Sequence, residues 1–235
     1  MYDELMKDVP YKQWANFIDE VLQQHLGENH KDRIVLDLAC GTGNITYLLA
    51  QKGYDMIGVD ISIDMLSQAQ AKADGEQILF LAQDMRKLDL YGTIDAAVCA
   101  CDGLNYILEE AQLEAVFKRI KMFLNPGGVF IFDMNTTHKF KEVLGGKTFV
   151  SDSDSAAYEW QNHFDMETGI NKYHVIFTLK GSSPFEEVHY QRAYQVDMVC
   201  GLLQKAGFSC VDVRDGYSEA PVKKDSTRAV FICTF

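Results

Sequence analysis

The chain has 235 residues, which is room for one large domain or for a domain of about 150 residues that carries an insertion. Its 47% hydrophobic and 24% charged residues are typical of a globular protein with a full core, so wholesale disorder is not expected. The 34 acidic residues outnumber the 22 basic ones, and the net charge of -12 repels phosphate backbones and anionic lipid headgroups, which argues against nucleic-acid and membrane-surface partners.

The amino terminus is acidic and polar, where a signal peptide is basic and then apolar, and no run of about 18 apolar residues occurs. These features predict a cytoplasmic protein. The cysteines lie in apolar, strand-like contexts and lack the spacing of a zinc site, so we expect reduced core thiols and no metal. They are Cys40, Cys99, Cys101, Cys200, Cys210 and Cys233.

The first part of the chain alternates short apolar runs with helical patterns. Apolar residues at helical spacing predict a helix over 14–26, and a glycine turn at 41–43 separates a strand at 34–36 from a helix at 45–51. The alternation then continues with expected strands at 56–60, 78–82, 94–101 and 129–133, and expected helices at 63–73 and 112–124. This order predicts a mainly parallel sheet covered by helices on both faces.

The pattern changes after about residue 140. Three strand-like segments at 158–165, 171–179 and 186–195 predict an antiparallel meander, and a helix at 197–206 and strands at 209–216 and 229–235 follow it. We therefore expect an α/β domain formed by residues 1–139 and 196–235. Residues 140–195 are expected to be inserted in it as an antiparallel lid or substrate subdomain.

Acidic residues stand at or just after the ends of four successive predicted strands. They are Asp37, Asp60, Asp84 and Asp102. Because the carboxyl ends of parallel strands meet at one edge of a sheet, these carboxylates would repel an anionic pyrophosphate. The dinucleotide pattern G-x-G-x-x-G is also interrupted, since Thr46 stands where its third glycine would be. The edge suits a cofactor that carries a sulfonium and an ammonium group.

The segment 35–43, VLDLACGTG, resembles the first motif of the class I S-adenosylmethionine-dependent methyltransferases, with Ala39 where the first glycine is usual. The resemblance covers about residues 33–135 through its motifs and the elements after residue 197 by strand order. It implies a Rossmann-like methyltransferase fold with a seven-stranded, mostly parallel sheet, helices on both faces and an antiparallel β insertion. It also implies S-adenosyl-L-methionine as the cofactor and transfer of its methyl group to an acceptor.

The resemblance further implies a set of cofactor contacts. It places Asp37 near the methionyl ammonium, Asp60 on the ribose hydroxyls and Asp84 on the adenine amino group. The whole expected set is Tyr11, Asp37, Ala39, Gly41, Gly43, Asp60, Ile61, Met65, Asp84, Met85 and Cys101. Other roles stay open at this point: each aspartate can be a turn or helix cap, and Ile61 and Met65 can be ordinary core residues.

Methyl transfer from a sulfonium needs position, desolvation and, for some acceptors, a base. The candidates for such a role are Asp102, Tyr106, His138, His163 and His189, and none of them is named as the base. The chain lacks the Asn-Pro-Pro-aromatic or Asp-Pro-Pro-aromatic segment of family members that methylate nucleic-acid bases or glutamine amides. With the charge of -12, this favours a small-molecule acceptor methylated on nitrogen or oxygen.

Two alternatives remain at the level of the sequence. One is a non-catalytic module that binds the cofactor as a sensor or scaffold, and the other is an NAD-dependent oxidoreductase, which Thr46 and Asp37 disfavour. The aromatic residues of the insertion suit a pocket or a subunit interface, so the sequence is compatible with a homodimer.

Overall fold

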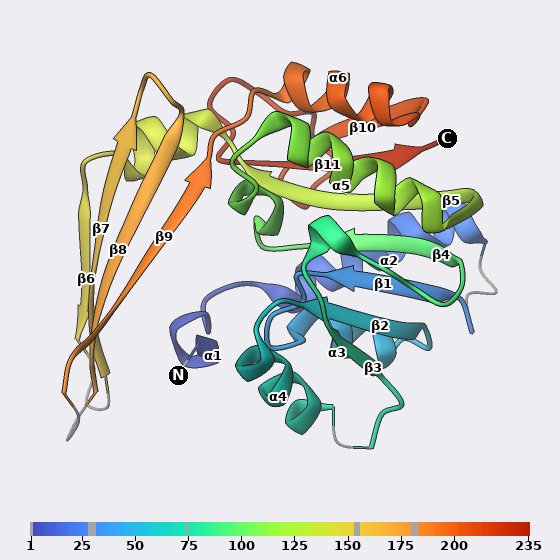
Figure 1. Ribbon diagram of the computed structural model, residues 1–235, viewed down its shortest axis with the longest axis horizontal. Coiled ribbons are helices and arrows are strands. Elements are labelled where there is room, and N and C mark those ends of the chain that lie inside the picture. Colours follow the sequence, from blue (N-terminus) through green and yellow to red (C-terminus); the bar gives the residue numbers. More distant parts are fainter. Residues whose placement is uncertain (1, 28–31, 74, 153–155, 180–182) are drawn as a thin grey trace.

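A seven-stranded sheet forms the centre of the computed structural model, which describes residues 2–27, 32–73, 75–152, 156–179 and 183–235 (Figure 1). The strand order is β10-β11-β5-β4-β1-β2-β3. Their bounds are β1 Ile34–Leu38, β2 Asp55–Asp60, β3 Leu79–Ala82, β4 Ile94–Cys99, β5 Leu124–Asn135, β10 Cys210–Asp215 and β11 Arg228–Thr234. Neighbouring strands from β3 to β5 are parallel, and β11 runs antiparallel to both β5 and β10. The predicted seven-stranded, mostly parallel sheet is confirmed.

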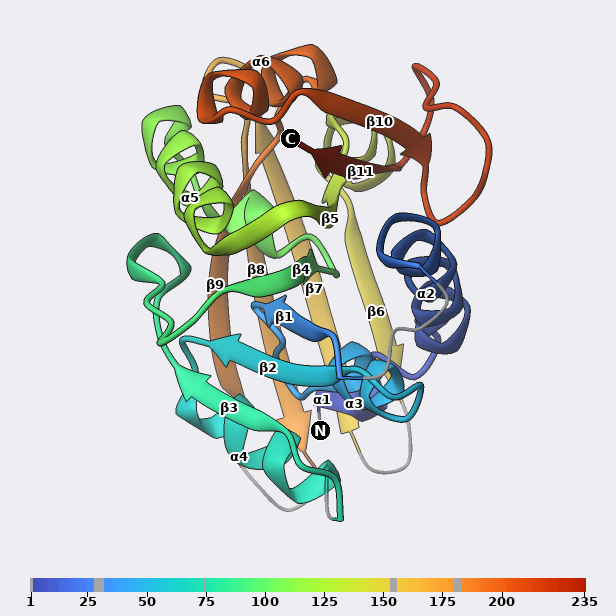
Figure 2. The same cartoon turned by 90° about the vertical axis from the view of Figure 1, so that its right-hand side faces the viewer.

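Helices cover both faces of this sheet, as the alternation of patterns predicts. Figure 2 shows α2 and α5 on opposite sides of it. Period-2 alternation sends Val35 to the face covered by α2 and α3, and the next residue, Leu36, to the face covered by α5 and α6. The helices are α1 Tyr2–Leu5, α2 Tyr11–Leu26, α3 Asn44–Ala50, α4 Ile63–Lys72, α5 Glu110–Phe123 and α6 Val196–Ala206, with short helices η1 Met85–Lys87 and η2 Gly103–Tyr106.

The strand after α5 begins earlier than predicted. β5 starts at Leu124 rather than at residue 129, because Leu124 already pairs with Ile94 before a shift of register brings Val129 opposite Ala96. Gly127, with a φ of 79°, lies within this shift. The segment Pro126-Gly127-Gly128 therefore follows the end of the helix and forms an irregularity within the strand rather than a loop before it.

A second, antiparallel sheet has the order β6-β7-β8-β9. Its strands are β6 Thr148–Asp152, β7 Ala156–Asp165, β8 Ile170–Leu179 and β9 Phe185–Arg192, and a π-helix, η3 Lys139–Leu144, precedes them. Three of these strands were predicted. The prediction of three strands was incomplete, because β6 is short and carries no alternating pattern of its own, so only its pairing with β7 defines it.

The second sheet faces the carboxyl ends of β1 and β4 (Figure 1). Asn105, fully buried, links the two sheets: its amide Nδ2 donates to the backbone oxygen of Arg192 at the end of β9, at 2.8 Å. The same side chain accepts a hydrogen bond from the backbone N–H of Asn135 at the end of β5, at 2.9 Å. One amide therefore fixes the end of the second sheet to the edge of the first.

The described helices and cysteines bear on the expected absence of a membrane span and on the expected reduced thiols. Of the helices in the described residues, none is both long enough and apolar enough to cross a membrane. The thiols of Cys40, Cys99, Cys101 and Cys200 are free, and Cys99 is fully buried. The thiol of Cys210 lies outside the described side chains. The described residues contain no group of three or more His, Cys, Asp or Glu arranged to hold a metal.

The packing between β2 and the edge strand β3 requires a glycine on β2. A methyl group at Gly58 would lie 2.6 Å from Cδ1 of Phe80 and 3.1 Å from Sγ of Cys40. We expect Gly58→Ala to lower the free energy of unfolding by about 1–3 kcal/mol through overpacking, measured by urea denaturation. Gly92→Ala is the control, because no heavy atom lies within 4 Å of its added methyl. Equal stability of the two variants would contradict this packing.

Candidate functional site

A cavity of about 770 Å³ lies between the carboxyl edge of the first sheet and the inner face of the second. The ends of β1, β2 and β4 form its floor, the amino-terminal segment and η2 form its sides, and β7, β8 and β9 close it with aromatic side chains. Its volume lies within the range of pockets that bind a cofactor or a small molecule.

Most of the residues predicted to contact a cofactor line this cavity. They are Tyr11, Asp37, Ala39, Gly41, Asp60, Ile61, Met65, Asp84, Met85 and Cys101. Gly43 does not line it. Its φ is 73°, and a Cβ at this position would lie 3.0 Å from Cβ of Ala69, so Gly43 ends the turn and lets α4 pack against it. Ile61 is 69% exposed, so the alternative that it is a core residue is wrong.

The turn after β1 is left-handed at alternate residues. Ala39, Gly41 and Gly43 have φ values of 56°, 55° and 73°. Asp60 at the end of β2 holds this turn, because its Oδ2 accepts the backbone N–H of Gly41 at 2.8 Å while its Oδ1 accepts that of Ser62 at 2.8 Å. A carboxylate has about four acceptor positions, so each oxygen of Asp60 retains capacity for a ligand hydroxyl.

Asp37 is a buried carboxyl group, 2% exposed, at the edge of the cavity. Burial, with the nearby charge of Asp60, raises its pKa to about 7, although the Thr46 hydroxyl donates to its Oδ2 at 2.5 Å. Thr46 thus supplies a hydrogen bond at the position where a dinucleotide motif has its third glycine. Within the described part of the chain Asp37 has no ion-pair partner, so a ligand cation would find an uncompensated carboxyl group here.

Asp84 has the turn-cap role that the sequence left open as an alternative. Its carboxylate caps η1 by accepting the backbone N–H of Arg86 at 2.9 Å. It also forms an ion pair with the guanidinium of Arg86, with 2.6 Å between Oδ2 and Nη2. The hydrogen bonds from Arg86 hold the pKa of Asp84 below its usual range. Asp84 is therefore a turn cap that also lines the cavity.

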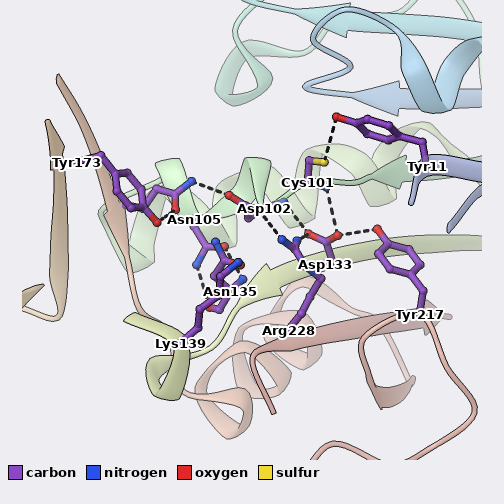
Figure 3. Close-up of polar contacts among 11 residues, drawn as sticks. Tyr11, Cys101, Asp102, Asn105, Asp133, Asn135, Lys139, Tyr173, Tyr217 and Arg228 are labelled. Atoms are coloured by element: carbon purple, nitrogen blue, oxygen red, sulfur yellow. Dashed lines mark hydrogen bonds and ion pairs between the residues drawn. The ribbon is translucent and has the colours of Figure 1, made fainter. Parts of the chain in front are cut away.

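The floor of the cavity ends in a network around Asp133, which is 0% exposed (Figure 3). Its carboxylate accepts the backbone N–H groups of Cys101 and Asp102 at 3.1 and 2.6 Å. It also accepts the Arg228 guanidinium at 2.7 Å and the Tyr217 hydroxyl at 2.6 Å. Cys101 and Asp102 have φ values of 63° and 53°, an unfavourable conformation for two consecutive non-glycine residues, and these hydrogen bonds hold them in it.

Asp102, one of the candidate catalytic residues, is already occupied on both oxygens. Arg228 Nη2 donates to its Oδ1 at 2.9 Å, and Gln191 Nε2 donates to its Oδ2 at 2.8 Å. Burial opposes ionisation of Asp102, but Arg228, Lys139 and the Gln191 hydrogen bond hold its pKa below the ordinary value. A carboxylate in this state is a weak proton acceptor, so the arrangement suits positioning better than base catalysis.

The other candidate catalytic residues separate into two groups. Tyr106 and His189 line the cavity, with their rings 5.9 Å apart in an edge-to-face arrangement. Burial raises the pKa of Tyr106, and the charge of Asp102 adds to this rise. His138 and His163 do not line the cavity: His138 precedes η3, and His163 lies on the outer face of β7, where it is exposed.

The cavity-lining residues that the sequence did not indicate include Lys139, Gln191 and Arg228. Lys139 in η3 donates to Oδ1 of Asn135 at 2.8 Å, and burial together with Arg228 lowers its pKa. The only sequence signal for such residues is a charged or amide side chain within an otherwise apolar or aromatic segment. That signal is weak, because strand ends often carry such residues.

The amino-terminal segment closes one side of the cavity. Asp3 in α1 accepts the Thr42 hydroxyl of the glycine turn at 2.6 Å and forms an ion pair with Lys72 of α4 at 2.8 Å. The Tyr11 hydroxyl lies 4.0 Å from Sγ of Cys101, whereas Trp14 stacks on Tyr217 at 4.5 Å. Tyr11 thus lines the cavity, and Trp14 anchors α2.

Comparison with known proteins gives consistent matches. Residues 35–128 match the family of methyltransferase domains. The chain is 36% identical to the protein YqeM of Bacillus subtilis (strain 168), named as a methyltransferase, over 98% of this chain and 93% of that protein. Among solved structures, an S-adenosylmethionine-dependent methyltransferase from Clostridium acetobutylicum ATCC 824 has a TM-score of 0.90 and 33% identity and covers 100% of this chain and 96% of its own.

A more distant structure shares only the fold. The sugar N-methyltransferase KedS8 from Streptoalloteichus sp ATCC 53650 has a TM-score of 0.81 at 20% identity, with 100% of this chain and 92% of that chain covered.

The buried Asp37 predicts a dependence of stability on pH. The pKa of Asp37 is about 7 in the folded protein and 3.8 ordinarily, so the folded state binds the proton more tightly than the unfolded state. The free energy of unfolding therefore includes the full contribution of this proton below about pH 4 and loses it as the pH rises through 7. Asp37→Asn removes this titration. We expect the variant to gain roughly 2–4 kcal/mol relative to the unmodified protein between pH 4 and pH 8, in urea denaturation without ligand.

The control is Asp89→Asn, at an exposed carboxyl group, whose stability profile should run parallel to that of the unmodified chain. An Asp37→Asn profile that also runs parallel would show that Asp37 is ionised throughout this range.

Proposed function

The chain belongs to the class I S-adenosylmethionine-dependent methyltransferases, and we propose that it methylates a nitrogen or oxygen atom of a small molecule bound beneath its second sheet. S-adenosyl-L-methionine is the cofactor of this family and supplies an electrophilic methyl group when it is bound. The observation that carries the proposal is the single cavity that runs from the glycine turn after β1 to the aromatic inner face of β7–β9.

The cofactor half of this cavity fits a zwitterionic ligand with a ribose. The buried Asp37, without an ion pair in the described residues, suits the methionyl ammonium, and Asp60 retains acceptor capacity for the two ribose hydroxyls. The exposed Ile61 is available to one adenine face, and Asp84 and Met85 lie at the same end of the cavity. The strand-end carboxylates disfavour a pyrophosphate, and thus NAD.

The acceptor half is enclosed by the second sheet, which we assign to a substrate subdomain of residues 140–195. Its inner face presents aromatic rings with polar groups, namely Tyr158, Trp160, Tyr173, Phe177, His189 and Gln191. Such a surface encloses a small polar molecule better than a polymer. The sugar N-methyltransferase of similar fold is consistent with an acceptor that bears amine or hydroxyl groups.

For the transfer, this chain supplies position and exclusion of water. The network of Asp133 and Arg228 fixes the loop at Cys101 and Asp102, which lies between the two halves of the cavity. Asp102, held ionised, orients neighbouring donors, and the aromatic face keeps bulk water from the acceptor. These contributions hold the acceptor atom and the methyl donor in a productive geometry. Such positioning is a large source of rate enhancement for a reaction between two bound molecules.

The proposal is tested by binding followed by turnover. Calorimetry should detect S-adenosylhomocysteine binding and no appreciable NAD binding. The protein is then incubated with S-adenosylmethionine and a fractionated cell extract, and products are detected by mass. We expect a methylated metabolite in the low-molecular-mass fraction, and Asp60→Ala, which lacks the ribose contact, as the inactive control. Methylation confined to protein or nucleic-acid fractions would contradict the small-molecule acceptor, and cofactor binding without any product would favour a non-catalytic module.

Neighbouring residues on β9 test the lid assignment. His189 lines the cavity, whereas Tyr190 points to the opposite face of the sheet and is 46% exposed. We expect His189→Ala to lower kcat/KM for the identified acceptor about fivefold or more, the loss of one polar contact, with cofactor affinity unchanged within about twofold. Tyr190→Ala should leave both quantities unchanged. If Tyr190→Ala instead converts a dimer to a monomer in light scattering and lowers the rate, the sheet is a subunit interface.

A further inference from the structure

The hydrogen bonds that connect the second sheet to Asp102 have a fixed direction. Asp102 already accepts from the Arg228 guanidinium, which can only donate, and the ionised carboxylate can only accept. Gln191 must therefore turn its amide NH₂ toward Asp102, where Nε2 lies 2.8 Å from Oδ2. Its carbonyl oxygen consequently points to Tyr173, whose hydroxyl donates to Oε1 at 2.8 Å.

The alternative orientation of this amide is unfavourable. A flipped Gln191 would place its oxygen 2.8 Å from a carboxylate oxygen of Asp102 with no hydrogen between them. Gln191 is 1% exposed, so water does not replace the lost hydrogen bond at low cost. The charges of Arg228 and Asp102 thus determine where the proton of the Tyr173 hydroxyl points, two side chains away.

Tyr173 lies at the end of this chain of hydrogen bonds and lines the acceptor half of the cavity. Tyr173 is 7% exposed. The centroid of its ring lies 5.5 Å from that of Trp160 and 6.4 Å from that of Phe140. Burial raises the pKa of Tyr173, and the Asn171 amide, which donates toward the phenol, opposes this rise. Because the hydroxyl proton is committed to Gln191, the phenol oxygen has only acceptor capacity, which it shares between the Asn171 amide and a ligand.

We propose that Tyr173 determines specificity in the acceptor site by accepting a hydrogen bond from an N–H or O–H group of the acceptor molecule, and that Gln191 positions it for this. This proposal rests on the proposed small-molecule acceptor. It adds that the acceptor presents a hydrogen-bond donor, and not an acceptor, to Tyr173. An acceptor with a donor group at this point completes a buried hydrogen bond. A molecule of the same shape with only a carbonyl or ether oxygen there places two acceptors against each other, which buried sites discriminate against strongly.

The test uses two neutral probes of nearly equal shape, cyclohexanol and cyclohexanone, titrated by ligand-observed NMR into the protein saturated with S-adenosylhomocysteine. Cyclohexanol can donate a hydrogen bond and cyclohexanone cannot. We expect the unmodified protein to bind cyclohexanol about two- to tenfold more tightly, the factor that one net hydrogen bond provides. Tyr173→Phe should abolish this preference by weakening cyclohexanol alone.

Gln191→Leu distinguishes polarity from a merely structural role. Without the Gln191 oxygen, the Tyr173 hydroxyl is free to donate a hydrogen bond to a ligand. Cyclohexanone should therefore bind more tightly, while the affinity for cyclohexanol is unchanged. The ratio of the two affinities should fall toward one. Equal weakening of both probes, or no preference in the unmodified protein, would overturn the proposal. Calorimetry with S-adenosylhomocysteine verifies that each variant is folded, and Tyr173→Phe decides the question by itself if Gln191→Leu does not fold.

The outcome also separates this proposal from the one on which it depends. If S-adenosylhomocysteine binds but neither probe does, the assignment of Tyr173 as a recognition point for a hydroxyl group falls, while the turnover assay on extract fractions decides separately about the small-molecule acceptor. If both probes bind with equal affinity, the acceptor site stands and only its polarity is wrong.

Discussion

The geometry of the site depends on one buried carboxylate. Asp133, near the carboxyl end of β5, holds two consecutive left-handed residues, Cys101 and Asp102, by their backbone N–H groups, and Arg228 neutralises its charge. Left-handed non-glycine residues each cost on the order of 1–3 kcal/mol, so the turn persists only because charge-assisted hydrogen bonds offset that cost. The loop between the two halves of the cavity is therefore held from beneath, by the sheet, and does not depend on a ligand for its shape.

The same guanidinium connects this loop with the second sheet. Arg228 bridges Asp133 and Asp102, and Asp102 in turn accepts from Gln191 of β9. Such a pair of carboxylates would repel each other without the arginine between them, and removal of one partner from a buried ion pair is far more costly than the pair is favourable. The main effect of this ion cluster is therefore to fix the relative positions of β4, β5, β11 and β9.

The sequence predicts the parts of this molecule whose signals are local. The alternation of apolar residues indicates the strands of the first sheet, and the glycine turn with Asp37 and Asp60 indicates where a ligand binds, because each signal lies within about twenty residues. Arg228 could not be predicted as a partner of Asp102, since 126 residues separate them and only the antiparallel pairing of β11 with β5 brings them together. His163 and His189 look alike in the sequence, and only the register of the second sheet puts one outside the cavity and the other inside.

The position of Arg228 on β11 also has a consequence for folding. β11 is the last strand described along the chain, and it pairs between β5 and β10. Contacts of such long sequence separation form late, because the entropy of closing a long loop must be overcome first. We therefore expect the glycine turn after β1, whose partner Asp60 is 19 residues from Gly41, to form earlier in folding than the loop at Asp102, whose partner Arg228 is 126 residues away.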